Sequence, residues 1–242
     1  FDLSINELKN RFLLNSFADL QKAWQETLDI EELNKKFYKD IANWYFWAEK
    51  NVTFPVGDNT DTEESRNAIN VIRLVTRLIF VWFLKEKHLV PDELFNQNKL
   101  QNILKFEEFN GKSVYYKAIL QNLFFATLNQ EMNTPSKEKK RKFRSLNKNP
   151  RGRDGNYLIT NLYRYERFFK QPQEALGLFE SIPFLNGGLF ECLDRKIEKD
   201  GKYTEIRVDG FSDNKKNPLK VPNNAEGCFL QNFRLTDIYN TK

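Results

Sequence analysis

The chain has few of the residue types that could perform acid–base or metal chemistry. It contains a single histidine, His88, and two cysteines, Cys192 and Cys228, which do not form a CxxC pair. A histidine-rich metal site is excluded, and a Ser–His or Cys–His catalytic unit would depend on one residue at the end of a predicted helix. We interpret His88 as a residue that interacts with carbonyl groups at that helix end. The cysteines suggest no disulfide framework and fit a reducing, cytoplasmic setting.

Two short motifs contain residue types used in DNA enzymes, but not in the sequence context that the chemistry requires. Pro91–Asp92 together with Glu138–Lys139–Lys140 has the carboxylates and lysine of a Mg²⁺-dependent nuclease of the PD–ExK type. Pro91–Asp92 is already explained as a helix start, and Glu138 lies in a polybasic segment rather than on a predicted strand. Asn217–Pro218–Leu219 lacks the aromatic residue with which the Asn-Pro-Pro-Tyr motif of adenine methyltransferases stacks on a flipped base.

The glycine-rich patterns GxGxxG and GxxxxGK[ST], which hold phosphate groups, do not occur in the sequence. We therefore assign no catalytic, cofactor-binding or metal-ligating residue within this chain. Whether the protein is an enzyme stays open on this evidence, because the sequence begins with Phe1 rather than Met and has the character of a fragment of something longer.

The best functional candidate is a basic segment between residues 137 and 153, whose only acidic residue is Glu138. Nine cations there could neutralise DNA phosphates, with counterion release as the driving force, and Phe143 could stack on a base. Prolines and glycines in and around it favour a mobile loop over residues 134–156. The alternative is a solvated surface loop without a ligand. The candidate DNA-binding residues are Lys137, Lys139, Lys140, Arg141, Lys142, Arg144, Lys148, Arg151 and Arg153.

The net charge of +5 and the pI of about 9.0 permit a nucleic-acid partner without requiring one. If the segment lies along the phosphate backbone, its contacts should be independent of base sequence, because mobile Lys and Arg side chains position a protein rather than identify bases.

One apolar stretch, residues 67–89, organises the predicted fold. It reads NAINVIRLVTRLIFVWFLKEKHL and would form a helix that is apolar almost all round, as expected of a helix with neighbours on several sides. We expect Ile79, Trp82 and Phe83 to be buried. A membrane span is disfavoured, because Arg77 and Lys85 bound the apolar run and a span needs roughly 20 mostly apolar residues.

Apolar periodicity and turn residues predict the remaining elements. Asp200–Gly201 predicts a β-hairpin turn over residues 197–203, with Ile206 and Val208 extending the second strand. Gly187 or Gly188 is expected to have a positive φ in a tight turn. Further helices are predicted over residues 4–17, 18–28, 30–51, 98–106, 113–131 and 173–181, with a short one opening at Pro91.

These elements predict a mainly α fold, a multi-helix bundle around the buried central helix at 67–89, with a small β-hairpin near the C-terminus. The 40% hydrophobic content, with 22 Phe, is sufficient for a substantial core. We divide the chain into a helical domain (1–133), a basic flexible loop (134–156) and a smaller mixed α/β extension packed on the helical domain (157–242).

Four stretches in order resemble one family of DNA-modifying enzymes. They read LDIEELNKKFYKDIANWYFWA (28–48), RLVTRLIFVWFLKEKHLVPDELF (73–95), YYKAILQNLFFATLNQEM (115–132) and IPFLNGGLFECLD (182–194). This order resembles the region between the nuclease and methyltransferase domains of bifunctional type IIG restriction–modification enzymes, in the adenine-methylating group.

The resemblance implies that the parent protein uses S-adenosylmethionine to methylate adenine and Mg²⁺ to cut double-stranded DNA. The residues for both reactions would lie in flanking domains, so no catalytic residue is transferred to this chain. The hypothesis that follows is a helical connector that positions the nuclease and methyltransferase domains and adds non-specific DNA backbone contacts, with no membrane partner. The alternatives are a free-standing helical protein-interaction module that does not bind DNA, and a complete small nuclease.

Overall fold

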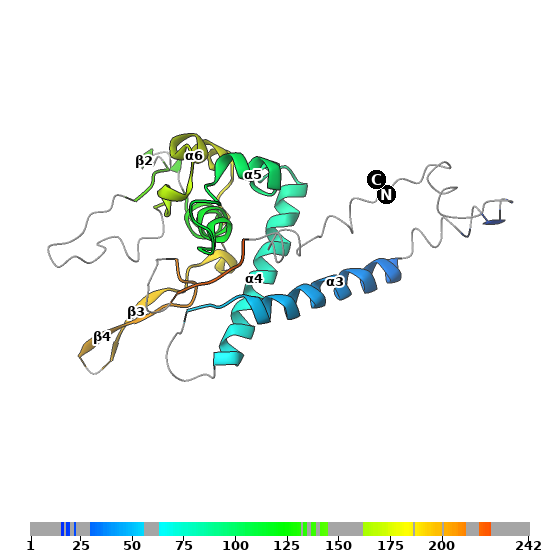
Figure 1. Cartoon of the computed structure of the whole chain (residues 1–242), viewed down its shortest axis with the longest axis horizontal. Coiled ribbons are helices and arrows are strands. Elements are labelled where there is room, and N and C mark those ends of the chain that lie inside the picture. Colours follow the sequence, from blue (N-terminus) through cyan, green and yellow to red (C-terminus); the bar gives the residue numbers. More distant parts are fainter. Residues whose placement is uncertain are drawn as a thin grey trace.

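The computed structural model describes residues 16, 18–19, 22, 30–55, 63–131, 133–134, 137–138, 141–144, 162–185, 187–199, 201–211 and 218–223. The described chain is mainly helical, with a small antiparallel hairpin near its C-terminal end, which confirms the predicted fold class (Figure 1). The helices predicted over residues 4–17 and 18–28 fall almost wholly outside the described residues. The predicted division into three domains stays a prediction, although the hydrophobic core runs continuously from Trp44 to Val221.

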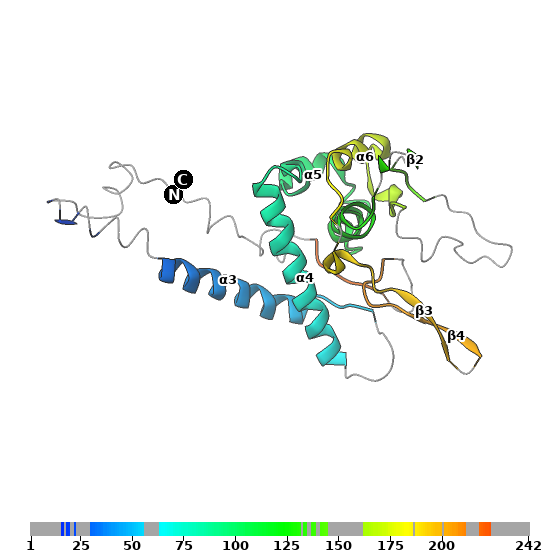
Figure 2. The ribbon, with the colours of Figure 1, turned by 180° about the vertical axis from the view of Figure 1, so that it is seen from behind.

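Helices α3 (Ile30–Asn51) and α4 (Glu63–Glu86) cross and pack against each other (Figures 1 and 2). The predicted helix over residues 30–51 is confirmed, and Trp44 lies on its buried face. The Asn67 side chain fixes the connection between the helices: its Oδ1 accepts the Phe54 N–H at 3.0 Å and its Nδ2 donates to the Val52 carbonyl at 2.8 Å. The N-terminal half of α3 projects away from the body, and Tyr38 there is 68% exposed.

The most deeply buried element is the π-helix η2 (Tyr116–Leu128), seen nearly end-on inside the larger lobe in Figure 1. Periodicity over residues 113–131 predicted a helix with most of its apolar residues on one face. The structure differs, because every residue of η2 is buried, including polar Gln121, Asn122 and Thr127. π-Helices are rare and usually occur as single turns, so this one is unusual for its length of 13 residues.

Polar side chains of η2 are tolerated inside the core because they bond to neighbouring backbone. Asn122 exchanges two hydrogen bonds with Arg164: its Nδ2 donates to the Arg164 carbonyl at 3.0 Å, and its Oδ1 accepts the Arg164 N–H at 2.9 Å. Gln121 donates to the Asp209 carbonyl at 2.9 Å. A buried polar group without a partner costs about 1–3 kcal/mol, so these bonds fix which chain segments lie against η2.

Helix α4 presents one side to the core and another to solvent. Trp82 is buried, as predicted, and Ile79 is half-buried, but the prediction for Phe83 is wrong: it is 54% exposed. Four large apolar side chains are exposed along one side of the helix, although the Phe80 ring also packs against Phe190, with ring centres 5.8 Å apart. We call this surface the α4 apolar stripe. It consists of Ile69, Ile72, Phe80 and Phe83.

By length and composition, residues Asn67–Glu86 of α4 would suffice to cross a membrane, and half of that apolar window is buried inside the protein. Core helices of soluble proteins pass the same test. Arg77 lies in the middle of this segment with its guanidinium bonded inside the protein, which identifies this side of α4 as a core face.

Helix α4 ends in a hydrogen-bond pattern that centres on His88. The His88 N–H donates to the Lys85 carbonyl at 2.8 Å and the Leu89 N–H donates to the Leu84 carbonyl at 2.9 Å, which is a Schellman motif. His88 occupies its left-handed position, with φ 57°, where glycine is usual. The predicted interaction of His88 with carbonyl groups at the helix end is therefore made by its backbone N–H.

Shorter elements complete the body. The 3₁₀ turn η1 (Asp92–Leu94) and α5 (Gln97–Ile103) follow α4, and α6 (Pro172–Glu180) lies beside α5 at one end of the lobe. Two further 3₁₀ turns are η3 (Glu166–Phe168) and η4 (Gly188–Phe190).

The strands form two separate antiparallel pairs. β1 (Asn133–Thr134) pairs with β2 (Lys137–Glu138). β3 (Arg195–Lys199) pairs with β4 (Lys202–Ile206) and forms the predicted hairpin, without Val208.

The glycine prediction for residues 187 and 188 is wrong. Gly187 has extended backbone, with φ −168°, and Gly188 begins the turn η4. The chain reverses there through a 3₁₀ turn, which any residue can form, so the left-handed region is not needed. Positive φ occurs instead at Gly111, Gly201 and Gly210.

Replacing Trp82 by Ala should lower the free energy of unfolding by about 3–5 kcal/mol, because a large buried side chain would leave a cavity. Replacing Phe83 by Ala is the matched control on the exposed side of the same helix, and should change stability by less than about 1 kcal/mol. Urea unfolding followed by tryptophan-independent circular dichroism measures both. Equal losses for the two variants would contradict the assignment of these faces.

Replacing Gly210 by Ala should be strongly destabilising, because φ is +60° and a Cβ atom would lie 2.7 Å from Cγ of Pro55. Replacing Gly188 by Ala, where a Cβ atom would meet nothing within 4 Å, should leave the melting temperature almost unchanged. Thermal melts of the two variants test this; a Gly210→Ala protein as stable as the parent would contradict the backbone geometry described here.

Candidate functional site

A buried charge cluster lies where α4 meets the C-terminal part of the chain. Arg77 is 2% exposed and donates to Oδ1 of Asp209 at 2.7 Å. Its other nitrogens donate to the carbonyls of Leu189 at 2.8 Å and Glu191 at 3.0 Å. The guanidinium also lies 5.0 Å from the centre of the Phe125 ring. A charge this deep is tolerated because each of the three guanidinium nitrogens donates a hydrogen bond and Asp209 balances the charge.

Asp194 organises the backbone on the other side of the cluster. Its carboxylate accepts the N–H groups of Val208, Asp209 and Gly210 at 2.8, 2.8 and 3.1 Å through one oxygen, and that of Phe211 at 2.8 Å through the other. Burial and then the neighbouring Asp209 carboxylate raise the pKa of Asp194 above its usual value, while the backbone N–H groups act in the opposite direction.

The cluster also contains the residue types of a metal site. Ligand atoms of Cys192, Asp194 and Asp209 all lie within 4.8 Å of one another. The carboxylates are already occupied by hydrogen bonds, including one from the Leu193 N–H to Asp209 at 2.7 Å, and Arg77 supplies the positive charge that a cation would bring. Burial raises the pKa of the Cys192 thiol, which disfavours the thiolate that binds metals. We therefore assign the cluster a structural role.

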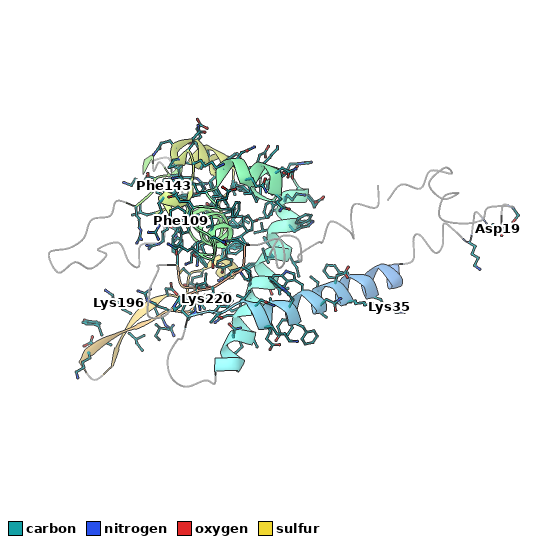
Figure 3. All side chains as sticks on the ribbon, in the orientation of Figure 1. Asp19, Lys35, Phe109, Phe143, Lys196 and Lys220 are labelled. Carbon is teal, nitrogen blue, oxygen red and sulfur yellow. The ribbon has the colours of Figure 1, made fainter. Side chains whose placement is uncertain are left out.

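The described part of the basic segment is anchored to the body. The Lys142 carbonyl accepts the Tyr163 N–H at 3.0 Å, and the Arg144 N–H donates to the Tyr163 carbonyl at 2.9 Å. The Phe143 ring packs against Tyr163 and Phe169, with ring centres 6.1 and 5.5 Å apart. Residues 142–144 are thus held on the body, whereas the flexible loop predicted over residues 134–156 stays a prediction as a whole. The Phe143 ring, labelled in Figure 3, packs against aromatic rings of the body in this structure, and is not free as expected for stacking on a base.

Arg141 is a structural residue in this arrangement. Its guanidinium donates to the Tyr163 hydroxyl at 2.8 Å and to the Ile182 carbonyl at 2.9 Å, and the side chain is half-buried. Thr127 of η2 bonds to the same hydroxyl. Burial raises the pKa of Tyr163, so its hydroxyl keeps its proton in this network.

The other candidate DNA-binding residues have different placements. Lys142 is exposed and Arg144 is half-buried. Lys137 lies in β2. The residues outside the described part of the chain are Lys139, Lys140, Lys148, Arg151 and Arg153.

The described residues give the nuclease-like pattern no support. Asp92 lies in η1, 3.6 Å from Nζ of Lys85, and Glu138 lies in β2. In both views α5 and α6 stand between β2 and the C-terminal end of α4 (Figures 1 and 2). Of the other motif, Asn217 is outside the described residues and Leu219 is a buried core residue.

Sequence reasoning missed two sets of charged residues. In the sequence, Arg77 only bounds the apolar run, and its position there does not indicate that its ion-pair partner lies 132 positions later. The hairpin was found, but its exposed cations Arg195, Lys196 and Lys202 were not considered; their signal was a cluster of basic residues in two short strands. Figure 3 labels Lys196 on the projecting hairpin.

Comparison with known proteins identifies one relative. The chain is 28% identical over 217 aligned residues to a protein of Methanocaldococcus jannaschii named "Putative type II restriction enzyme and methyltransferase". The alignment covers 76% of this chain and 15% of that protein, so the chain spans a small part of the length of its relative. No family model matches the chain, and no solved structure matches it. The chain is thus related to a restriction–modification protein.

Replacing Arg77 by Met should lower the free energy of unfolding by about 3–5 kcal/mol, because it removes the close cation of the buried Asp209 carboxylate and leaves only Arg73, 3.9 Å away. Replacing Arg73 by Met is the control: its guanidinium lies 3.9 Å from Asp209 with the side chain 27% exposed, and its loss should cost less than about 1 kcal/mol. Adding Asp209→Asn to Arg77→Met should recover part of the loss in a double-mutant cycle. Additive effects of the two substitutions would contradict a direct ion pair.

Proposed function

We propose that this chain is the helical connector of a bifunctional type IIG restriction–modification enzyme, one that methylates adenine and cuts double-stranded DNA. In this proposal it holds the nuclease and methyltransferase parts of the same polypeptide in a fixed relation, and contributes sequence-independent contacts to the DNA backbone. In this proposal, S-adenosylmethionine and Mg²⁺ are bound by those other parts of the polypeptide.

Relationship to the archaeal protein is the observation that carries the proposal. That protein is named for both restriction and methylation, and this chain matches 15% of its length. A match of that extent leaves most of the longer protein for the two catalytic activities, which is what a connector between them requires.

The basic segment supports DNA contact. Residues 142–144 of the segment are held on the body by backbone hydrogen bonds between Lys142, Arg144 and Tyr163. The Lys142 side chain is exposed at this anchored point. Lys and Arg side chains in such a position bind phosphate groups without distinguishing bases.

The α4 apolar stripe is a second observation that supports a connector role. Phe80 and Phe83 lie 6.5 Å apart between ring centres and are 40% and 54% exposed, and Ile69 and Ile72 are each more than half exposed. Large apolar side chains exposed along one side of a helix are suited to contact with another protein surface. In the proposal this stripe packs against a neighbouring part of the same polypeptide. The same stripe is what a free-standing protein-interaction module would use, so DNA binding is the deciding measurement.

The decisive experiment is a salt titration of DNA binding by the chain and by a variant with Lys137, Lys139, Lys140 and Lys142 replaced by Ala. Arg141 is left in place because it holds the segment on the body. Each phosphate contact contributes about 0.9 to the slope of log K against log salt, so the slope should fall by up to about 3–4. Affinities for duplexes of unrelated sequence should fall together.

A control variant removes the same charge from elsewhere, with Lys35, Lys39, Lys50 and Lys87 replaced by Ala; these are exposed on α3 and at the end of α4. Its slope should match the parent. An unchanged slope in the basic-segment variant, or no salt-dependent binding by the parent, would refute DNA contact by this segment and favour the protein-interaction module.

A further inference from the structure

The β3–β4 hairpin projects from the body as an arm in both ribbon views (Figures 1 and 2). Tyr203 near its tip is 74% exposed, and Arg195, Lys196 and Lys202 are exposed along it. An isolated two-stranded hairpin is marginally stable in water; in this one, Ile206 at the base is buried and Ile197 is half-buried. A projecting pair of strands with little packing of its own suggests a surface kept for a partner.

The base of the arm is held rigidly by the buried charge cluster. Asp194, the residue before β3, accepts the backbone N–H groups of residues 208–211, which follow β4. Asp209 is in turn bonded to Arg77 of α4. Both ends of the hairpin therefore leave from one fixed point, and the arm has a defined direction relative to the helical body.

The pairing register of β3 and β4 determines which charged residues of the arm lie on the same face of the hairpin. Residues paired across an antiparallel ladder share a face, and successive pairs alternate between faces. One face receives the pairs Arg195–Ile206, Ile197–Thr204 and Lys199–Lys202, and the other receives Lys196–Glu205 and Glu198–Tyr203. Among the side chains that the structure describes, the first face carries the exposed Arg195 and Lys202 and no acidic residue, whereas the second carries Lys196 and Glu198.

We propose that the β3–β4 hairpin is a DNA-contacting arm that enters the major groove of a duplex, with the face of Arg195 and Lys202 directed at phosphate groups. This inference rests on the proposed function in taking duplex DNA as the partner. The major groove admits a two-stranded β-ribbon, and five residues per strand span about 16 Å. The charge asymmetry of the register gives the arm one face suited to phosphates.

The test compares the parent chain with Arg195→Ala/Lys202→Ala and with the control Lys35→Ala/Lys39→Ala, which removes the same charge from α3. The arm variant should lower the slope of log K against log salt by about 1.8, and the control should not change it. In the parent, a duplex should also slow amide hydrogen exchange in residues 196–205 while leaving α3 unaffected. This second measurement needs no substitution in the hairpin.

The groove is tested with duplexes containing glucosylated 5-hydroxymethylcytosine, whose sugar fills the major groove. On this DNA the difference between the parent and the arm variant should disappear; if it persists, the placement in the major groove is wrong. If the basic-segment variant lowers the slope but the arm variant does not, and exchange in 196–205 is unaltered, the arm inference fails while the proposed function stands. A parent chain that shows no salt-dependent DNA binding would overturn both.

Discussion

The ion pair between Arg77 and Asp209 is the interaction on which the arrangement of this chain depends. It joins the middle of α4 to a segment 132 positions later, in a place where both side chains are almost completely buried. A buried ion pair is poor evidence of extra stability, since replacing it with well-packed apolar groups can be neutral. Its value here is in specificity: a wrong register of the C-terminal segment would leave a charge buried without a partner.

The buried polar residues of η2 likewise determine which chain segments pack against that helix. Asn122 exchanges hydrogen bonds with the backbone of Arg164 in the manner of a strand neighbour, and thereby fixes the segment that contains Tyr163. Tyr163 in turn pairs with the backbone of the basic segment and accepts a hydrogen bond from Arg141. The Asn122 amide at the centre of the core thus fixes the segment that contains Tyr163, and Tyr163 in turn holds residues 142–144 of the basic segment.

The two candidate DNA-contacting elements differ in how they are held. The basic segment is anchored through backbone pairing with Tyr163, whereas the β3–β4 arm is anchored through Asp194 and the Arg77–Asp209 pair. The α4 apolar stripe lies on the same helix that carries Arg77, and its side chains are 40% to 54% exposed. A connector whose protein-facing stripe and DNA-contacting arm are joined through α4 and the Arg77–Asp209 pair would hold two catalytic parts in a fixed relation.

The sequence by itself determined the local elements. Apolar periodicity located α3 and α4, and Asp200–Gly201 located the hairpin, because these signals depend on residues within a few positions of one another. It also identified the basic segment from composition alone. The tertiary structure decided which side of α4 is exposed, and so corrected the expectation for Phe83. It also decided that Arg141 is a structural residue and that Arg77 pairs with Asp209. Those outcomes depend on contacts between segments 41 to 132 positions apart, and no pattern along the chain encodes which of several buried charges will meet.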